Sequence, residues 1–303
     1  MKKIVAGLAL VFVLVYGALT GQQQQESPRD KEVVASDVIH IPETADHDDS
    51  PRITVDRTAV YAGELLLIDP EHPVPDNLVV KDVVNLFENQ HLLEGFGILD
   101  NQVEMPQQLL ERFTAMVASA SADGIDQFLI TSGYRDQTEQ AMLYNDRGPE
   151  AAHPPGHSEH NLGLAMDIGS RLGLMKDAPE GKWLAQHAWK HGFILRYPED
   201  KTEITGVMYE PWHYRYVGLP HSAIMQQHGF VLEEYLDFLK EQKNVVFELD
   251  GISYKVSYYA FGSEEQLEVP VMDNYMLSGD NRDGIVVTTR IGEARTETGA
   301  EQS

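Results

Sequence analysis

The sequence predicts an α+β protein, and three observations support this fold class. Apolar residues recur at helical spacing across residues 105–124. The apolar run at 127–131 follows directly and is typical of a buried strand. Beyond residue 243 the composition changes to segments rich in β-forming residues, separated by turn residues. The chain thus combines helices and a strand in its middle with strands near its end.

Three further helices are expected in the central region. Residues 136–147 form a helix capped by Asp136, and residues 180–193 form another that ends at Gly192. The segment 220–242 is expected to be one long helix or two. These helices would supply the apolar faces that cover a sheet.

A small β module is expected at the end of the chain. Residues 245–261 contain two β-rich runs around Asp250-Gly251, which is a hairpin signal. The runs 267–272 and 284–290 add strands. We therefore place a β-rich C-terminal module and polar tail at 244–303, without visible internal repeats.

The N-terminus carries the features of an export segment. Lys2 and Lys3 precede the apolar run Ile4–Thr20, and a polar, Gln-rich stretch follows. Because Thr20 makes a poor cleavage site, we favour an uncleaved signal anchor over a cleaved signal peptide. Either one places the remaining chain outside the cytoplasmic membrane.

The expected organisation therefore has four parts. A signal anchor or signal peptide occupies 1–20 and a polar linker occupies 21–50. A catalytic domain spans 51–243, in which residues 53–80 form strands or an arm packed on the main body. The β-rich module at 244–303 completes the chain.

Composition excludes several function classes. The 303 residues carry 48 acidic and 23 basic side chains, for a formal net charge of −25. This charge argues against nucleic-acid binding, which depends on a basic surface that releases counterions. The absence of cysteine excludes disulfides, thiolate zinc sites and cysteine nucleophiles. The His-Glu-x-x-His and Ser-x-x-Lys motifs are also absent.

The stretch "GHSEHNLGLAMDI" gathers candidate metal ligands beside flexible backbone. His160 and Asp167 could face one pocket across a bend at Gly163, and His213 of "YEPWHYRYVG" could supply a third ligand. Two imidazoles and one carboxylate suit a hydrolytic zinc ion with an open position for water. Taken one at a time, each residue also fits an ordinary structural role. Ordinary roles are assigned to His40, His47, His72, His91, His187, His191, His221 and His228, and His153 and His157 to loops near the site.

Two charged residues complete the candidate site. Glu210 precedes His213 by three residues and could take a proton from the attacking water and pass it to a leaving amine. Arg135 follows a strand and a glycine turn, and its planar guanidinium suits a carboxylate or an oxyanion. Trp212 and Tyr214 flank His213 and could wall the pocket.

Several stretches together closely resemble the VanY-type D-alanyl-D-alanine carboxypeptidases, which are bacterial cell-wall zinc peptidases. They are "SGYRDQTEQ", "PPGHSEHNLGLAMDI", "HGFILRYPEDKTEITGVMYEPWHYRYVG" and "LPHSAI". The resemblance is dense from 128 to 239, and the longer, VanB-cluster kind matches nearly the whole chain. It implies a small α+β domain with a central antiparallel sheet, shared with the hedgehog signalling domain.

The resemblance also implies roles for individual residues. His160, Asp167 and His213 match the family's zinc ligands, Glu210 its catalytic base and Arg135 its substrate-binding and transition-state arginine. Matches to pocket positions are Gln140, Ser158, Tyr197 and Trp212. Asp136 departs from the pattern, because many relatives have Ser there.

The expected activity is a zinc-dependent D,D-carboxypeptidase that removes the last D-Ala of peptidoglycan pentapeptide stems or lipid-linked precursors. A role in glycopeptide resistance or in wall remodelling would follow. Two alternatives stay open, an L,D-carboxypeptidase that trims tetrapeptides and a non-catalytic wall-binding protein. A monomer is the default expectation.

Overall fold

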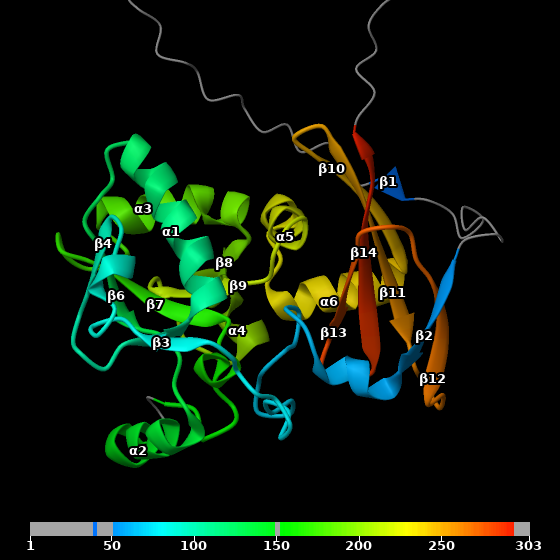
Figure 1. Cartoon of the computed structure of the whole chain (residues 1–303), viewed down its shortest axis with the longest axis horizontal. Coiled ribbons are helices and arrows are strands. Elements are labelled where there is room, and N and C mark those ends of the chain that lie inside the picture. The colour runs from blue at the N-terminus through cyan, green and yellow to red at the C-terminus, as the bar shows by residue number, and fades with distance from the viewer. Residues whose placement is uncertain (1–38, 41–50, 149–151, 294–303) are drawn as a thin grey trace, which may run out of the picture. The chain divides into compact units, whose positions relative to one another are not determined.

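The computed structural model describes residues 39–40, 51–148 and 152–293. Two five-stranded sheets form the centre of the described fold (Figure 1). The predicted signal segment 1–20 lies outside these residues, as do most of the linker 21–50 and the end of the tail. Within the described part of the chain, no helix has the length and apolar character needed to cross a membrane.

The first sheet forms the centre of the predicted catalytic domain. Its strands, in spatial order, are β4 (Phe96–Ile98), β6 (Phe128–Ser132), β7 (Ala165–Ser170), β9 (His213–Tyr216) and β8 (Phe193–Leu195). All neighbouring pairs are antiparallel except β4 and β6, which run parallel. The α+β class is therefore confirmed, and the expected antiparallel sheet carries one parallel edge strand.

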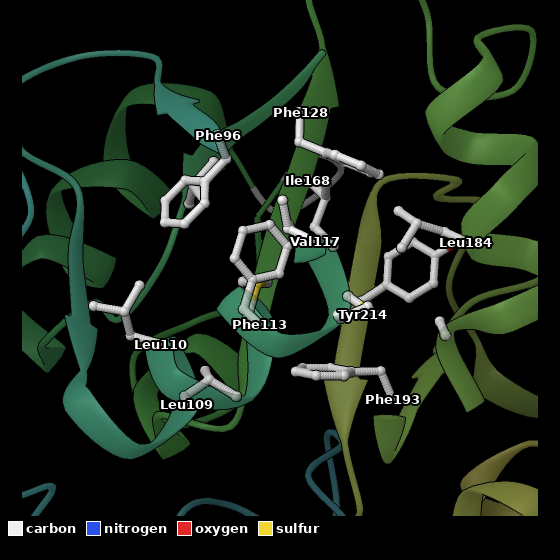
Figure 2. Close-up of a cluster of buried hydrophobic side chains, with 14 of the residues drawn as sticks. Phe96, Leu109, Leu110, Phe113, Val117, Phe128, Ile168, Leu184, Phe193 and Tyr214 are labelled. Carbon is white, nitrogen blue, oxygen red and sulfur yellow. The ribbon is translucent and has the colours of Figure 1, made fainter. Parts of the chain in front are cut away.

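Helix α1 (Gln107–Ala122) covers one face of this sheet. Its apolar residues recur every three to four positions, so that Phe113 and Val117 face the sheet residues Phe128 and Ile168 (Figure 2). The resulting core is continuous from α1 through β6 and β7 to β9. Burial of this stripe, at roughly 25 cal/mol per Å² of apolar surface, is the main stabilising contribution here.

Glycines in the left-handed conformation end two of the predicted helices. Residues 220–242 form two helices, α5 (His221–His228) and α6 (Leu232–Gln242), separated at Gly229 with φ of 66°. The helix expected at 180–193 is wrong beyond His187. There α3 (Pro179–His187) gives way to a 3₁₀ turn that ends at Gly192.

Helix α2 (Gln137–Arg147) begins with a capping box. The Glu139 amide donates to Asp136 Oδ1 at 2.7 Å, and the Asp136 amide donates to Glu139 Oε2 at 3.1 Å. Asp and Ser are both strong N-caps, so the departure at position 136 preserves the start of the helix. A short helix, α4 (Thr202–Thr205), lies further along the chain.

The second sheet contains the predicted hairpin and the predicted strand at 284–290, whereas the predicted run at 267–272 lies outside it. Its order is β1 (Ile39–His40), β10 (Asn244–Leu249), β11 (Ile252–Ala260), β14 (Gly284–Glu293) and β13 (Tyr275–Gly279). Asp250 and Gly251 join β10 to β11 with φ values of 51° and 75°. Positive φ at both turn residues is what the type I′ turn of a two-residue hairpin requires, so the predicted hairpin is confirmed.

Two short ribbons complete the described chain. Strand β3 (Val83–Asn85) pairs with β5 (Glu104–Pro106), and β2 (Arg52–Asp56) pairs with β12 (Gln266–Pro270). The second ribbon was not anticipated, because it joins residues that lie more than 200 positions apart and periodicity carries no pairing information. It links the start of the predicted domain 51–243 to the predicted module 244–303.

Candidate active site

Three potential metal ligands meet at one point of the first sheet. Asp167 on β7 is paired directly with His213 on β9, and His160 lies in a 3₁₀ turn (Glu159–Leu162) just before β7. One ligand atom from each residue lies within 4.8 Å of the other two. The structure thus brings together the three residues that the sequence singled out as candidate ligands.

The bend between His160 and Asp167 depends on Gly163. Its φ is 73°, and an added Cβ would lie 2.7 Å from Val80 Cγ1. Any other residue would be strained at that φ and would also clash, so glycine is needed for the turn that returns the chain into β7.

Hydrogen bonds orient both imidazoles. His160 Nδ1 lies 2.6 Å from the carbonyl oxygen of Gly133, so Nδ1 carries the proton and the Nε2 lone pair is free. That Nε2 atom lies 3.4 Å from Asp167 Oδ1. His213 is oriented the opposite way, with Nδ1 3.1 Å from Asp167 Oδ1 and Nε2 3.2 Å from Glu159 Oε2. The ligand atoms that converge are thus His160 Nε2, His213 Nδ1 and an Asp167 oxygen.

Electrostatic interactions keep the Asp167 carboxylate of this cluster ionised. Burial opposes ionisation of Asp167, but His160 and His213 hold its pKa far below the usual range. Burial lowers the pKa of His160, against the attraction of Asp167. Burial would lower the pKa of His213 too, but its hydrogen bonds to Asp167 and Glu159 raise it to about 9. Such carboxylate partners make an imidazole a stronger metal ligand.

This donor set fits zinc. Two imidazole nitrogens and one carboxylate oxygen are a common catalytic zinc combination, and they leave a coordination position open. The outer partners of both imidazoles are also in place, namely the Gly133 carbonyl and the Glu159 carboxylate. The residues present therefore match the metal that the sequence resemblance implies.

Glu210 lies beside the cluster, on the loop that enters β9. Its Oε2 atom is 3.8 Å from His213 Nδ1, and its backbone is held by bonds to Tyr197 and His213. Burial raises the pKa of Glu210, which His213 opposes and Asp167 reinforces. A carboxyl group with a raised pKa is closer to the range in which a general base and acid work near neutral pH.

Arg135 reaches the site from the loop after β6. Its Nε donates to Gln140 Oε1 at 3.0 Å and its Nη1 donates to Ser132 Oγ at 2.9 Å. Its backbone amide donates to the His160 carbonyl, which ties this loop to the metal cluster. Burial lowers the pKa of Arg135, and the attraction of Asp167 opposes that shift. A cleft of about 450 Å³ opens beside it, lined by Thr131, Tyr134, Glu139 and Met142 among others.

The other predicted pocket residues lie in different settings. Gln140 is buried and its amide is committed to Arg135 and the His153 carbonyl, so it holds Arg135 in place. Ser158 caps the turn that carries His160. The Tyr197 ring packs 4.9 Å from the His213 ring, whereas Trp212 is 39% exposed. His157 contacts the Asp69 carbonyl and is a loop residue, as expected.

Sequence reasoning missed a buried charge network behind His213. Glu159 accepts hydrogen bonds from Arg196 Nε at 2.9 Å and Arg215 Nη1 at 2.8 Å. Arg196 also makes a two-bond pair with Glu233 on α6, at 2.9 and 2.6 Å. The available signal was an arginine inside each of two apolar strand patterns, "FILRY" and "HYRYV". Buried strands accept such charges only when they are paired.

Comparisons with known proteins show which enzymes the chain is similar to. The family profile described as "VanY: D-alanyl-D-alanine carboxypeptidase" matches residues 102–219. A D-alanyl-D-alanine carboxypeptidase of Enterococcus faecium is 43% identical over 308 residues, covering 98% of this chain and 99% of the relative. Among solved structures, the vancomycin-resistance D,D-dipeptidase VanXYg, in complex with a D-Ala-D-Ala phosphinate analogue, has a TM-score of 0.65 and 32% identity. It covers 78% of this chain and 98% of its own.

A more distant likeness involves an enzyme of the alternative class. The LdcB LD-carboxypeptidase has a TM-score of 0.50 and 31% identity, covering 56% of this chain and 84% of its own. The fold is therefore shared by enzymes described as D,D- and as L,D-peptidases.

A zinc metallo-carboxypeptidase is the class of protein that the fold, the ligand cluster and these relatives define. Within that class, the chain belongs to the VanY family of D-alanyl-D-alanine carboxypeptidases.

Proposed function

We propose that this carboxypeptidase removes the terminal D-Ala from pentapeptide stems of peptidoglycan or from their lipid-linked precursors. The observation that carries the proposal is the convergence of His160, Asp167 and His213 within 4.8 Å, with Glu210 beside them. Arg135 supplies a cation next to the same point. Together these groups provide what hydrolysis of an amide at a free C-terminus requires.

The bound zinc ion would supply Lewis acidity, which lowers the pKa of a water and polarises a carbonyl. Glu210 would accept a proton from the attacking water through its carboxylate. Glu210 would then give that proton to the amine of the departing D-Ala. Its partly buried position supports the first role, because a raised pKa makes the Glu210 carboxylate a stronger base toward the attacking water.

Arg135 would stabilise negative charge on the substrate. Its Nε and Nη1 are held by Gln140 and Ser132, so the guanidinium is fixed before substrate arrives. A preorganised cation of this kind acts on charge that develops in the transition state without reorganising. The cleft beside Arg135 is the proposed place for the rest of the stem peptide.

An L,D-carboxypeptidase is the second candidate, favoured by the likeness to LdcB. It would use the same cluster on a tetrapeptide and differ only in the pocket. A non-catalytic wall-binding role is less well supported, since Glu210 and all three candidate ligands are present and clustered.

The proposed location is the outer face of the cytoplasmic membrane, with Ile4–Thr20 as anchor or as a cleaved signal. The apolar character of that segment after Lys2 and Lys3 supports this. Pentapeptide stems are displayed on that side. A monomer and a contribution to glycopeptide resistance belong to the same proposal, the latter because trimming removes the D-Ala-D-Ala end.

The test compares two substrates with the purified, zinc-loaded protein. Pentapeptide and tetrapeptide stems are incubated separately, and the products are weighed by mass spectrometry. Loss of one alanine mass from the pentapeptide only, abolished by a chelator and restored by added zinc, is the expected result. Loss from the tetrapeptide only would assign the L,D activity, and no loss from either would support the non-catalytic role.

A further inference from the structure

The His213 imidazole is held between two carboxylates with different surroundings. Asp167 faces the ligand cluster, whereas Glu159 lies behind the ring and is 2% exposed. Glu159 Oε2 is 3.2 Å from His213 Nε2. Its other oxygen, Oε1, accepts from Arg196 Nε and Arg215 Nη1, which fixes the rotation of the carboxylate.

We propose that Glu159 is a positioning residue that keeps the His213 proton on Nε2, so that Nδ1 is free to bind zinc. This inference deepens the proposed function, since it rests on His213 being a zinc ligand. An ionised carboxylate only accepts hydrogen bonds, so Nε2 must donate to it. In the zinc-bound protein the Nδ1 lone pair would then point into the cluster, where a metal ligand needs it.

The surrounding charges explain why a carboxylate is stable in this position. Glu159 and Glu233 balance Arg196 and Arg215, and all four side chains are buried. Arg215 also donates to the carbonyl oxygens of Glu64 and Leu66, which anchors it independently of Glu159. The network is therefore paired without any charge on His213.

The same geometry makes a glutamine substitution informative. In Glu159→Gln the oxygen must stay on the side of the two arginines, since these groups only donate. The amide NH₂ would then face His213 Nε2 and make that atom an acceptor. The imidazole proton would move to Nδ1 and point at the position of the metal.

Zinc affinity is the first readout. Metal-free wild-type and variant proteins compete for zinc with a chelator of known affinity. Glu159→Gln is expected to bind zinc about 10- to 100-fold more weakly than wild type, as outer-partner losses generally do. Glu233→Gln is the matched control, because it removes a carboxylate from the same network without touching an imidazole, and it should bind zinc nearly as well as wild type. Equal losses in both variants, or none in Glu159→Gln, would overturn the proposal.

The second readout needs no variant and stays decisive if Glu159→Gln does not fold. In zinc-loaded wild-type protein labelled with ¹⁵N, two-bond proton–nitrogen spectra show which His213 nitrogen carries hydrogen. The expected result is a protonated Nε2 and a hydrogen-free Nδ1. A proton on Nδ1 would overturn this inference while leaving pentapeptide cleavage, and so the proposed function, intact. Failure of the wild-type protein to bind zinc would overturn both.

Discussion

The Nδ1 atom of His213 and the Oδ1 atom of Asp167 lie 3.1 Å apart, because the two residues are paired on the antiparallel strands β7 and β9. Strand register therefore sets the spacing of two candidate ligands that are 46 positions apart in the chain. A slip of one residue would turn either side chain to the opposite face of the sheet. The sheet therefore fixes the positions of two of the three candidate ligands.

Replacement of the shared carboxylate should remove the metal. Asp167→Asn keeps the shape but loses the charge next to both imidazoles. We expect zinc affinity to fall by more than the ~10- to 100-fold typical of outer-partner changes, and activity to fall with it. Metal analysis after dialysis measures this, with the exposed Asp200→Asn as control. Full zinc occupancy in Asp167→Asn would contradict the ligand assignment.

Glu210→Gln should separate chemistry from metal binding. Without a carboxylate to accept and return the proton, kcat should fall by roughly 10²- to 10⁴-fold. Zinc content should stay at the wild-type level, because Glu210 is 3.8 Å from His213 Nδ1 and outside the ligand set. Glu203→Gln, an exposed substitution on α4, is the control. Unchanged turnover would show that another group is the base.

Substitutions of Arg135 and Gln140 should lower kcat/KM to different degrees. Arg135→Ala removes a preorganised cation, and kcat/KM should fall by roughly 10²- to 10³-fold. Gln140→Ala leaves the guanidinium in place but removes its Nε partner, so a smaller loss is expected. Arg147→Ala, exposed on the same helix α2, should have little effect. Steady-state kinetics with pentapeptide measure all three, and a larger loss for Gln140→Ala than for Arg135→Ala would contradict the assigned roles.

The loss of folding stability at acidic pH should depend on His221. This buried imidazole contacts the Tyr235 hydroxyl at 2.7 Å and Thr288 Oγ1 at 3.1 Å, and burial lowers its pKa to about 3. The unfolded chain binds a proton below its ordinary pKa of 6.5, whereas the folded chain does not. Stability is therefore lost as the pH falls from 6.5 toward 3, by up to ~1.4 kcal/mol per pH unit.

Urea unfolding of the metal-free protein at several pH values between 7 and 4 measures this effect. The metal-free form is used so that zinc release does not contribute. Wild type should lose stability on acidification more steeply than His221→Gln, which has no imidazole to protonate. Parallel curves for the two proteins would show that His221 does not cause the acid sensitivity.

Local markers drew attention to the candidate ligands and the candidate base, and the resemblance to the VanY family supplied their roles. Gly163 forces a bend between His160 and Asp167, and Pro211 separates Glu210 from His213. Some element boundaries also followed local rules, such as the Asp136 cap of α2 and, in the second sheet, the Asp250-Gly251 turn.

The network of Glu159, Arg196 and Arg215 could not be predicted in the same way. A charged residue in a sequence is normally solvated, and only the fold shows that these three are buried against one another. The pairing of β2 with β12 was hidden for a related reason, since partners far apart in the chain share no local pattern. Tertiary contacts decide both features.

The most direct test of the central claim is a crystallographic anomalous difference map of the zinc-loaded protein, recorded at the zinc absorption edge. The account predicts one strong peak bonded to His160 Nε2, an Asp167 oxygen and His213 Nδ1, with Glu210 beside its open side. A peak bonded to other residues, or none at this cluster, would contradict it.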